Sequence, residues 1–262
     1  MRQRSFVRRG DARSFALHPS AMRATYTKRD VPACCVDDGV GILCIEGPLD
    51  SKPGMWFDNY ERILGAFKDM LCDEDVRAIL LKIDSPGGDA AGLNECVTAM
   101  RRAKVVAGKP VYAYADEGAY SAAYALACAA DAIYLPEPGG LGSIGVIVAM
   151  MSFVRANEAQ GIDLQLVYSG DHKIDGNPDA PLTDAAIEHA QRRVDQLARI
   201  YWELVSESRG LRIKEVRALQ ADTFYGYEAV DVGLADDVMP LEELMTLIRA
   251  RLDDPMGIAE TG

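Results

Sequence analysis

Short apolar runs alternate with segments of helical spacing along most of this 262-residue chain. Residues 78–83 are apolar except for Lys82, and such a run is typical of a strand buried on both faces of a parallel sheet. Repetition of this order predicts an α/β fold with a mainly parallel sheet and flanking helices. We expect further strands over 40–45, 111–115, 132–135, 144–148, 164–168 and 234–238, and helices over 56–70, 90–107, 121–130, 151–160, 183–208 and 213–220 and from 241.

Basic residues are concentrated at the N-terminal end. Residues 1–29 carry eight Lys/Arg and one acid, Asp11, so the acidic excess behind the net charge of −12 lies in the rest of the chain. An acidic body argues against nucleic-acid binding there, whereas the basic segment can contact nucleic acid or an acidic partner, or remain a solvated tail. Phe15-Ala16-Leu17-His18-Pro19 is typical of a short docking segment. We therefore interpret 1–38 as a basic, partly flexible segment, 39–250 as one domain and 251–262 as a tail.

Other patterns exclude several classes of protein. The six cysteines lack metal-ligand spacing, which favours free, buried thiols in a reducing compartment over a disulfide framework. No apolar run reaches the length of a membrane span, and the basic N-terminal end lacks the apolar core of a secretory signal. No metal cluster or phosphate-binding loop is evident. We expect a cytoplasmic protein with no membrane anchor, metal or cofactor.

Two segments carry chemistry. Asp84-Ser85-Pro86-Gly87-Gly88 follows the strand at 78–83 and precedes a predicted helix, so its amides can stabilise an oxyanion. Ser121 opens an alanine-rich stretch in which few side chains would crowd an attacking oxygen, and Ala122 offers another amide. Each segment has a simpler explanation, a strand-to-helix turn and a helix N-cap respectively.

A serine nucleophile needs a neighbour that accepts its proton. The chain has three histidines, of which only His172 is a plausible base, and Lys173 adjoins it. Lysine serves this purpose when desolvation lowers its pKa. A solvated loop lysine is the simpler interpretation, and Asp171 and Asp175 favour the charged form unless they point away.

Several segments together resemble the signal-peptide-peptidase family of Ser–Lys peptidases, whose architecture is that of the crotonases and Clp proteases. About three quarters of the chain takes part in the resemblance. The segments occur in family order, as the strand at 41–48, the turn at 83–88, the block at 120–124, Leu141-Gly142-Ser143-Ile144-Gly145-Val146, the lysine loop, and residues 226–236.

The resemblance implies a role for each matching residue. Ser121 corresponds to the nucleophile, Lys173 to the general base, and Ser143 to a serine that helps to hold the lysine. Gly88 and Ala122 correspond to the residues whose amides form the oxyanion hole, with Gly87 in support. The family often has glycines after the nucleophile, whereas this chain has Ala122-Ala123, so a backbone donor is retained beside a narrower pocket.

The resemblance also implies a partner and a setting. Short family members with a basic N-terminal segment and a motif like Leu17-His18-Pro19 resemble bacteriophage head-maturation proteases, which cut scaffold and capsid proteins inside the prohead. We expect a homo-oligomeric ring acting on extended protein substrates such as scaffold, capsid or portal proteins, in the host cytoplasm or prohead. A soluble bacterial signal-peptide-peptidase-like protease, a crotonase-type acyl-CoA enzyme and an inactive scaffold-binding homologue are the alternatives.

Overall fold

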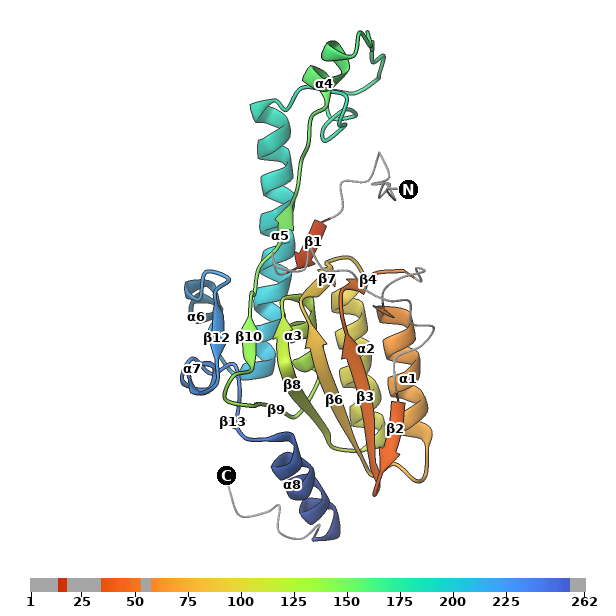
Figure 1. Ribbon diagram of the computed structural model, residues 1–262, viewed down its shortest axis with the longest axis vertical. Coiled ribbons are helices and arrows are strands. Elements are labelled where there is room, and N and C mark those ends of the chain that lie inside the picture. Colours follow the sequence, from red (N-terminus) through yellow and green to blue (C-terminus); the bar gives the residue numbers. More distant parts are fainter. Residues whose placement is uncertain (1–13, 18–33, 53–57, 255–262) are drawn as a thin grey trace, which may run out of the picture.

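The computed structural model describes residues 14–17, 34–52 and 58–254 (Figure 1). Its larger sheet has the strand order β12-β10-β8-β6-β3-β2, with β9 beside β8 and β13 beside β9. Only the β2–β3 and β10–β12 pairs are antiparallel, so the predicted mainly parallel sheet is confirmed. The strands are β2 (Cys34–Asp37), β3 (Val40–Glu46), β6 (Ala78–Ser85), β8 (Val111–Tyr120), β9 (Ala132–Leu135), β10 (Gly140–Gly142), β12 (Thr223–Tyr225) and β13 (Asp237–Val238).

A second, smaller sheet crosses one end of the larger one. Its strands follow the order β11-β1-β7-β4-β5. They are β1 (Ser14–Leu17), β4 (Leu49–Asp50), β5 (Asp58–Asn59), β7 (Gly87–Asp89) and β11 (Ile147–Val148). Both β1 and β2 belong to the predicted N-terminal segment, and they pair with strands of the body. The proposed boundaries of the segment, domain and tail stay a prediction.

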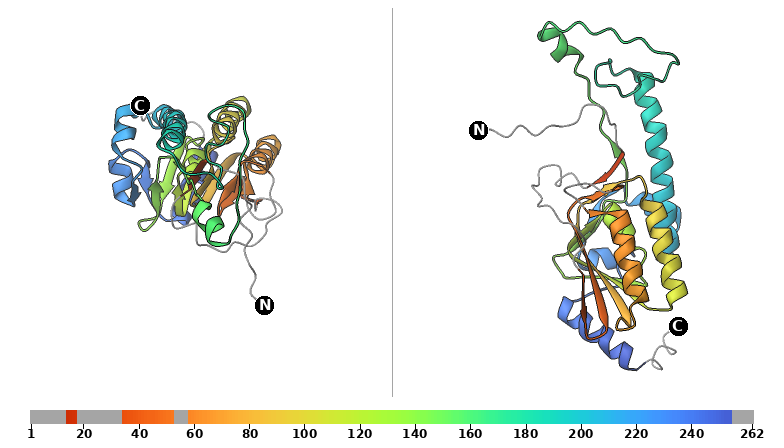
Figure 2. Two further views of the ribbon diagram at one scale, coloured as in Figure 1. Left: turned by 90° about the horizontal axis from the view of Figure 1, so that it is seen from above. Right: turned by 90° about the vertical axis from the view of Figure 1, so that its right-hand side faces the viewer.

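Helices cover both faces of the larger sheet (Figure 2). Ile79, Leu81 and Ile83 of β6 belong to the core that includes α1, α2, α3 and α5, whereas Ala78 and Leu80 pack in a second core with α8. Alternate residues of one strand are therefore buried on opposite faces, as its apolar run predicts. The helices are α1 (Tyr60–Cys72), α2 (Leu93–Ala107), α3 (Ala122–Ala127), α4 (Val154–Ala159), α5 (Asp184–Arg209), α6 (Ile213–Ala218), α7 (Tyr227–Asp231) and α8 (Leu241–Asp253).

An arm extends from this body. The first half of α5, together with α4 and the chain between these two helices, projects well beyond the sheets (Figures 1 and 2). Many of the large apolar side chains exposed in the described part of the chain lie along this arm, and Val167 is 94% exposed. Large exposed apolar side chains that gather in one region are typical of a protein–protein interface. The members on the arm are Ile162, Leu164, Val167, Tyr168, Leu182 and Ile187.

The structure corrects several predicted elements. The strand expected over 164–168 is wrong, because these residues lie in the exposed arm and have no strand assignment. The strand expected over 144–148 is reduced to β11, and the glycine-rich strand β10 was missed. The helix expected from residue 90 begins at Leu93, and the one expected over 121–130 is limited to 122–127. Trp56, placed at a helix start, lies outside the described residues, and α1 begins at Tyr60.

The structure also bears on the helices and the cysteines discussed from the sequence. Among the described residues, no helix combines the length and apolar character that crossing a membrane demands. All six cysteines are free, as predicted, but only Cys96 and Cys128 are buried. Burial raises the pKa of the Cys96 thiol to about 12 and that of Cys128 to about 11, so both remain protonated and inert. Cys34, Cys35 and Cys72 are exposed, contrary to expectation.

Phe67 of α1 is fully buried in the larger core, and its replacement tests that core. The substitution Phe67→Ala leaves a cavity, so we expect the free energy of unfolding in urea to fall by about 3–5 kcal/mol. Val106→Ala is the control, because Val106 is 89% exposed on α2 and its truncation changes stability by less than about 0.5 kcal/mol. Equal effects of the two substitutions would contradict the assigned core.

Candidate active site

Three neighbouring parallel strands end at one edge of the larger sheet. β6 ends at Ser85, β8 at Tyr120 and β10 at Gly142. Their ends are aligned, because Ser85 pairs with Ala119 and Gly142 pairs with Tyr120. Ligand sites of parallel α/β sheets lie outside the carboxyl ends of the strands. The residues that follow these three strands are therefore the candidates for a functional site.

Ser121 lies in a sharp turn between β8 and α3. Its φ of 54° and ψ of −122° belong to a region that residues with a side chain rarely adopt. Ser121 occupies the N-cap position of α3, but its hydroxyl makes no capping hydrogen bond. A strained serine that does not use its hydroxyl to cap its helix indicates a functional constraint at this turn.

Backbone hydrogen bonds hold this turn on both sides. The Ser121 amide donates to the carbonyl of Gly142 at 2.8 Å, and the Ala125 amide donates to the Ser121 carbonyl at 3.1 Å. The hydroxyl of Tyr201, which is buried on α5, donates to the same Ser121 carbonyl. Burial raises the pKa of Tyr201 well above its ordinary value, so this hydroxyl remains a donor. The contact of Tyr201 with Ser121 is not recognisable from the sequence, because a long stretch of chain separates α5 from Ser121.

Ser143 lies beside this turn, since it follows the glycine whose carbonyl binds Ser121. Its φ of 54° is also positive, and its amide donates to the carbonyl of Asp222 at 2.8 Å. Two strained serines therefore lie at adjacent strand ends.

The glycine pair forms part of a strand, although we had predicted a turn at a helix N-terminus. Gly87 and Gly88 lie on β7, which pairs with β4 through Gly88 and Leu49 and packs against α3. A Cβ atom on Gly88 would lie 1.8 Å from the Leu49 carbonyl oxygen, so only glycine fits. Gly87 has a φ of 97°, which also favours glycine. The need for two glycines is thus confirmed, with close backbone approach at Gly88 and left-handed geometry at Gly87.

Two polar residues that the sequence analysis did not single out fix β7. The Ser85 hydroxyl donates to the Gly47 carbonyl at 2.6 Å and accepts from the Gly87 amide at 3.2 Å. The buried Asp89 carboxylate accepts from the amide and the hydroxyl of Ser51 through one oxygen. These contacts attach the glycine strand to β4 and its preceding turn.

Lys173 lies apart from the other predicted site residues. It belongs to the turn at 171–176, its side chain is exposed, and that segment lies at the outer end of the arm (Figure 1). Asp175, one of the two acids expected to keep it charged, instead accepts from His172 and His189 at 2.8 Å each. Within one chain, the fold thus gathers the remaining candidates without the lysine. They are Gly87, Gly88, Ser121, Ala122 and Ser143.

A cavity of about 310 Å³ adjoins the site. It is lined by residues that directly follow β7, by Val146, which precedes β11, and by Tyr201, which holds the Ser121 turn. Leu197, Ile200 and Leu204 of α5 make most of its floor apolar. This position and lining suit an apolar side chain of a ligand bound beside Ser121.

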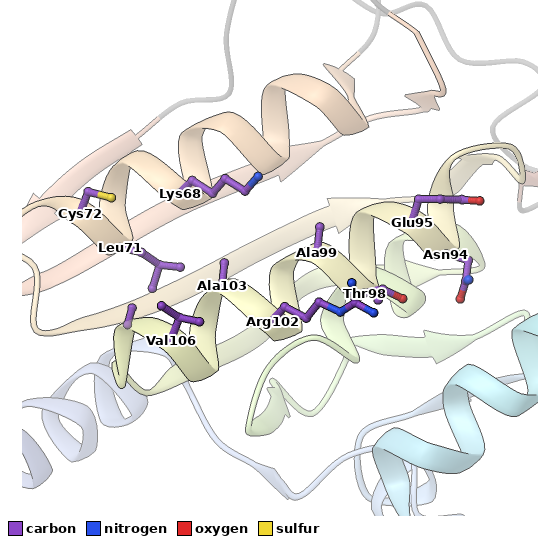
Figure 3. A pocket seen from close by; sticks show the side chains of 11 residues that line it. Lys68, Leu71, Cys72, Asn94, Glu95, Thr98, Ala99, Arg102, Ala103 and Val106 are labelled. Carbon is purple, nitrogen blue, oxygen red and sulfur yellow. The ribbon is translucent and has the colours of Figure 1, made fainter.

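Another cavity, of about 820 Å³, is a groove between α1 and α2 (Figure 3). Leu71, Ala99 and Val106 give it apolar walls, and the Arg102 side chain extends along α2 toward Thr98. Its lining contains none of the residues that gather around Ser121, and it shares only Asn94 and Glu95 with the smaller cavity.

The strain at Ser121 is testable through stability. Glycine adopts positive φ without steric cost, so Ser121→Gly is expected to unfold in urea with a free energy about 1 kcal/mol above that of Ser121→Ala. Both variants lack the hydroxyl, which makes them a matched pair. A glycine variant that is less stable than the alanine variant would contradict a strained backbone.

Comparison with known proteins identifies the family. Peptidase family S49 matches residues 103–253, a range that includes Ser121, Ser143 and Lys173. The capsid assembly protease C of Escherichia phage lambda is 34% identical over 223 residues, which cover 83% of this chain and 50% of that protein. The head-tail preconnector protein GP5 of Enterobacteria phage P21 is 31% identical over 231 residues, covering 86% and 46%. This chain thus spans about half the length of these relatives.

Solved structures agree at the level of the fold. An enoyl-CoA hydratase from Shewanella pealeana ATCC 700345 is similar with a TM-score of 0.51 at 13% identity, over 90% of this chain and 78% of that one. A likeness of this degree shows the shared crotonase-like fold and carries no information on chemistry. Because the family match extends over more than half of the sequence, the chain belongs to peptidase family S49.

Proposed function

We propose that the chain is a serine endopeptidase whose nucleophile is Ser121. The observation that carries this proposal is the strained turn at Ser121. This turn lies at the carboxyl ends of three parallel strands, and the Ser121 hydroxyl in it does not cap α3. The amide of Ala122 is the first of α3 and has no intrahelical acceptor, and the amide of Gly88 lies on the strand packed against α3. These two amides form the proposed oxyanion hole, with Gly87 as support.

The proposed reaction is acyl transfer to serine. Neutral Lys173 accepts the proton of Ser121 while the oxygen attacks a peptide carbonyl, and the two amides stabilise the tetrahedral oxyanion. The C–N bond then breaks as the lysine returns this proton to the leaving amine. The lysine next takes a proton from water, which attacks the ester, and the serine recovers its hydrogen as the acid product leaves. The reaction needs no metal or cofactor.

Lys173 is supplied by a neighbouring copy of the chain in this proposal. The lysine turn lies at the outer end of the arm, whereas Ser121 lies in the body (Figure 1). The arm exposes apolar side chains such as Val167 and Ile187, which a neighbour would cover. Such docking removes water from the lysine amine and favours its neutral form. Repeated head-to-tail contacts of this kind would form a ring if their rotation closes, and Ser143 is proposed to help hold the incoming amine.

The substrate is proposed to bind as an extended strand along β7. An added strand gains main-chain hydrogen bonds, and side-chain pockets provide selectivity. The 310 Å³ cavity beside Tyr201 has an apolar floor, which favours small or medium apolar side chains near the cleaved bond.

Scaffold, capsid or portal proteins of an assembling phage head are the proposed substrates, because both phage relatives carry names from head assembly and connection. The host cytoplasm or prohead is the matching location. A bacterial peptidase of the signal-peptide-peptidase type is the alternative, and one relative is a putative signal peptide peptidase of Enterococcus faecium, 25% identical over 192 residues.

Mixing two inactive variants tests the dyad and its origin together. Ser121→Ala and Lys173→Ala are each expected to cut labelled casein and a co-expressed capsid or scaffold protein at least about a thousand-fold more slowly. When equal amounts of both are co-assembled, roughly a quarter of the sites pair an intact serine with a neighbour's intact lysine, and activity returns to that level.

Lys214→Ala, which removes an exposed lysine of the body, serves as the control and should retain full activity. Unchanged cleavage by either site variant would refute the role of that residue. Single variants that are inactive and a mixture that remains inactive would instead place the lysine within the same chain as its serine.

A further inference from the structure

The N-terminal strand β1 lies between β7 and β11 in the smaller sheet, and we call this strand position the groove. It pairs antiparallel with β7, so that Ala16 faces Gly88, Leu17 faces Gly87 and Phe15 faces Asp89. On its other edge it pairs antiparallel with β11, through Ser14 with Val148 and Phe15 with Ile147. Residues 14–17 are therefore an internal strand of the smaller sheet, with a neighbouring strand on each edge (Figure 1).

This groove is the position that a substrate strand would need. A strand has two edges, and β4 already occupies one edge of β7 through the Leu49–Gly88 pair. The remaining edge is the one that β1 occupies. An extended substrate cannot pair with β7 beside Gly88 while β1 is there, so the two occupants exclude each other.

We propose that residues 14–17 are an intramolecular pseudosubstrate that blocks the groove until they are displaced. This inference rests on the proposed function in one respect, namely that the groove binds a peptide substrate. The segment is joined to the body through the chain between Leu17 and Cys34, so its effective concentration at the groove is about millimolar. A substrate presented at high local concentration, as in an assembled protein shell, can displace it, whereas a dilute peptide cannot.

The register suits this role. Ala16, a small residue, faces Gly88, whose amide is proposed to bind the substrate carbonyl.

Two variants test the pseudosubstrate. Ala16→Pro removes an amide and disfavours strand pairing, and deletion of residues 1–17 removes the strand altogether. If β1 occupies the groove for about nine-tenths of the time, either change is expected to lower KM for a short peptide about tenfold and to leave kcat unchanged. A synthetic peptide of residues 11–20 should inhibit the deletion variant competitively. Ser5→Pro is the control for a proline elsewhere in the N-terminal segment.

Hydrogen exchange gives a reading that does not depend on catalysis. The amides of residues 87–89 and 147–148 should exchange faster in Ala16→Pro than in the wild type and in Ser5→Pro. Equal exchange in all three proteins overturns the proposal, and so does a deletion that leaves KM unchanged. A wild type without peptidase activity overturns the proposed function instead, and exchange then tests the occupancy of the groove by itself.

A different cluster carries a second inference. His172 and Asp175, from the lysine turn, meet His189 on α5. The Nδ1 atom of each imidazole lies 2.8 Å from Oδ2 of Asp175, and the two ring centroids are 4.6 Å apart. The three ligand atoms all lie within 4.8 Å of one another. No metal site was expected from the sequence, because these residues lack a recognisable ligand spacing.

We infer that these three side chains form a binding site for a zinc-like divalent cation. Two imidazoles and one carboxylate are a common zinc ligand set, with water as the fourth ligand. A bound cation would attach the turn that contains Lys173 to α5 and restrict where this lysine can point.

Zinc and cobalt titrations test the site after the exposed thiols have been alkylated. The wild type should bind one equivalent of zinc with a raised melting temperature, and its cobalt complex should show visible bands without thiolate charge transfer. His189→Ala and Asp175→Asn should lose both signals, whereas His18→Ala, which removes the third histidine, should keep them. Equal zinc binding by the wild type and His189→Ala would overturn the site.

Discussion

The hydrogen bond from the Ser121 amide to the Gly142 carbonyl joins the chemistry of this protein to its sheet. It connects the end of β8 to the end of β10, and the Tyr201 hydroxyl binds the Ser121 carbonyl from the opposite side. Because the amide and the carbonyl of Ser121 are both hydrogen-bonded, the residue keeps a positive φ that a serine would otherwise avoid. The packing of β8, β10 and α5 therefore supplies the free energy that offsets this strain.

The rest of the site depends on how closely backbones approach one another. Gly88 allows β4 to pair with one edge of β7, and β1 pairs with the other edge, where an extended peptide would have to replace it. The arm has the opposite character, because it exposes apolar side chains around the lysine turn instead of burying them. The proposed site therefore takes residues from both the body and the arm, which the proposed assembly of several chains would bring together.

Much of this was predictable from residue patterns. The apolar run at 78–83 predicted a strand of the parallel sheet, and the glycine pair indicated the edge at which the candidate site lies. The roles proposed for Ser121 and Lys173 came from the family resemblance. What failed has physical causes. The run at 164–168 resembles a strand because it is apolar, but its side chains face outward from the arm. The pairing of residues 14–17 with β7 and the convergence of His172 and His189 on Asp175 depend on contacts between distant segments.

Covalent labelling of the wild-type protein with a fluorophosphonate probe, followed by peptide mass spectrometry, tests the central claim most directly. Such a probe reacts with a serine whose proton is removed by a base and whose developing oxyanion is stabilised. We expect one adduct per chain, located on Ser121, and no adduct after prior unfolding in urea. Modification of Ser143 or Ser85 with Ser121 unlabelled, or an unmodified folded protein, would contradict the account.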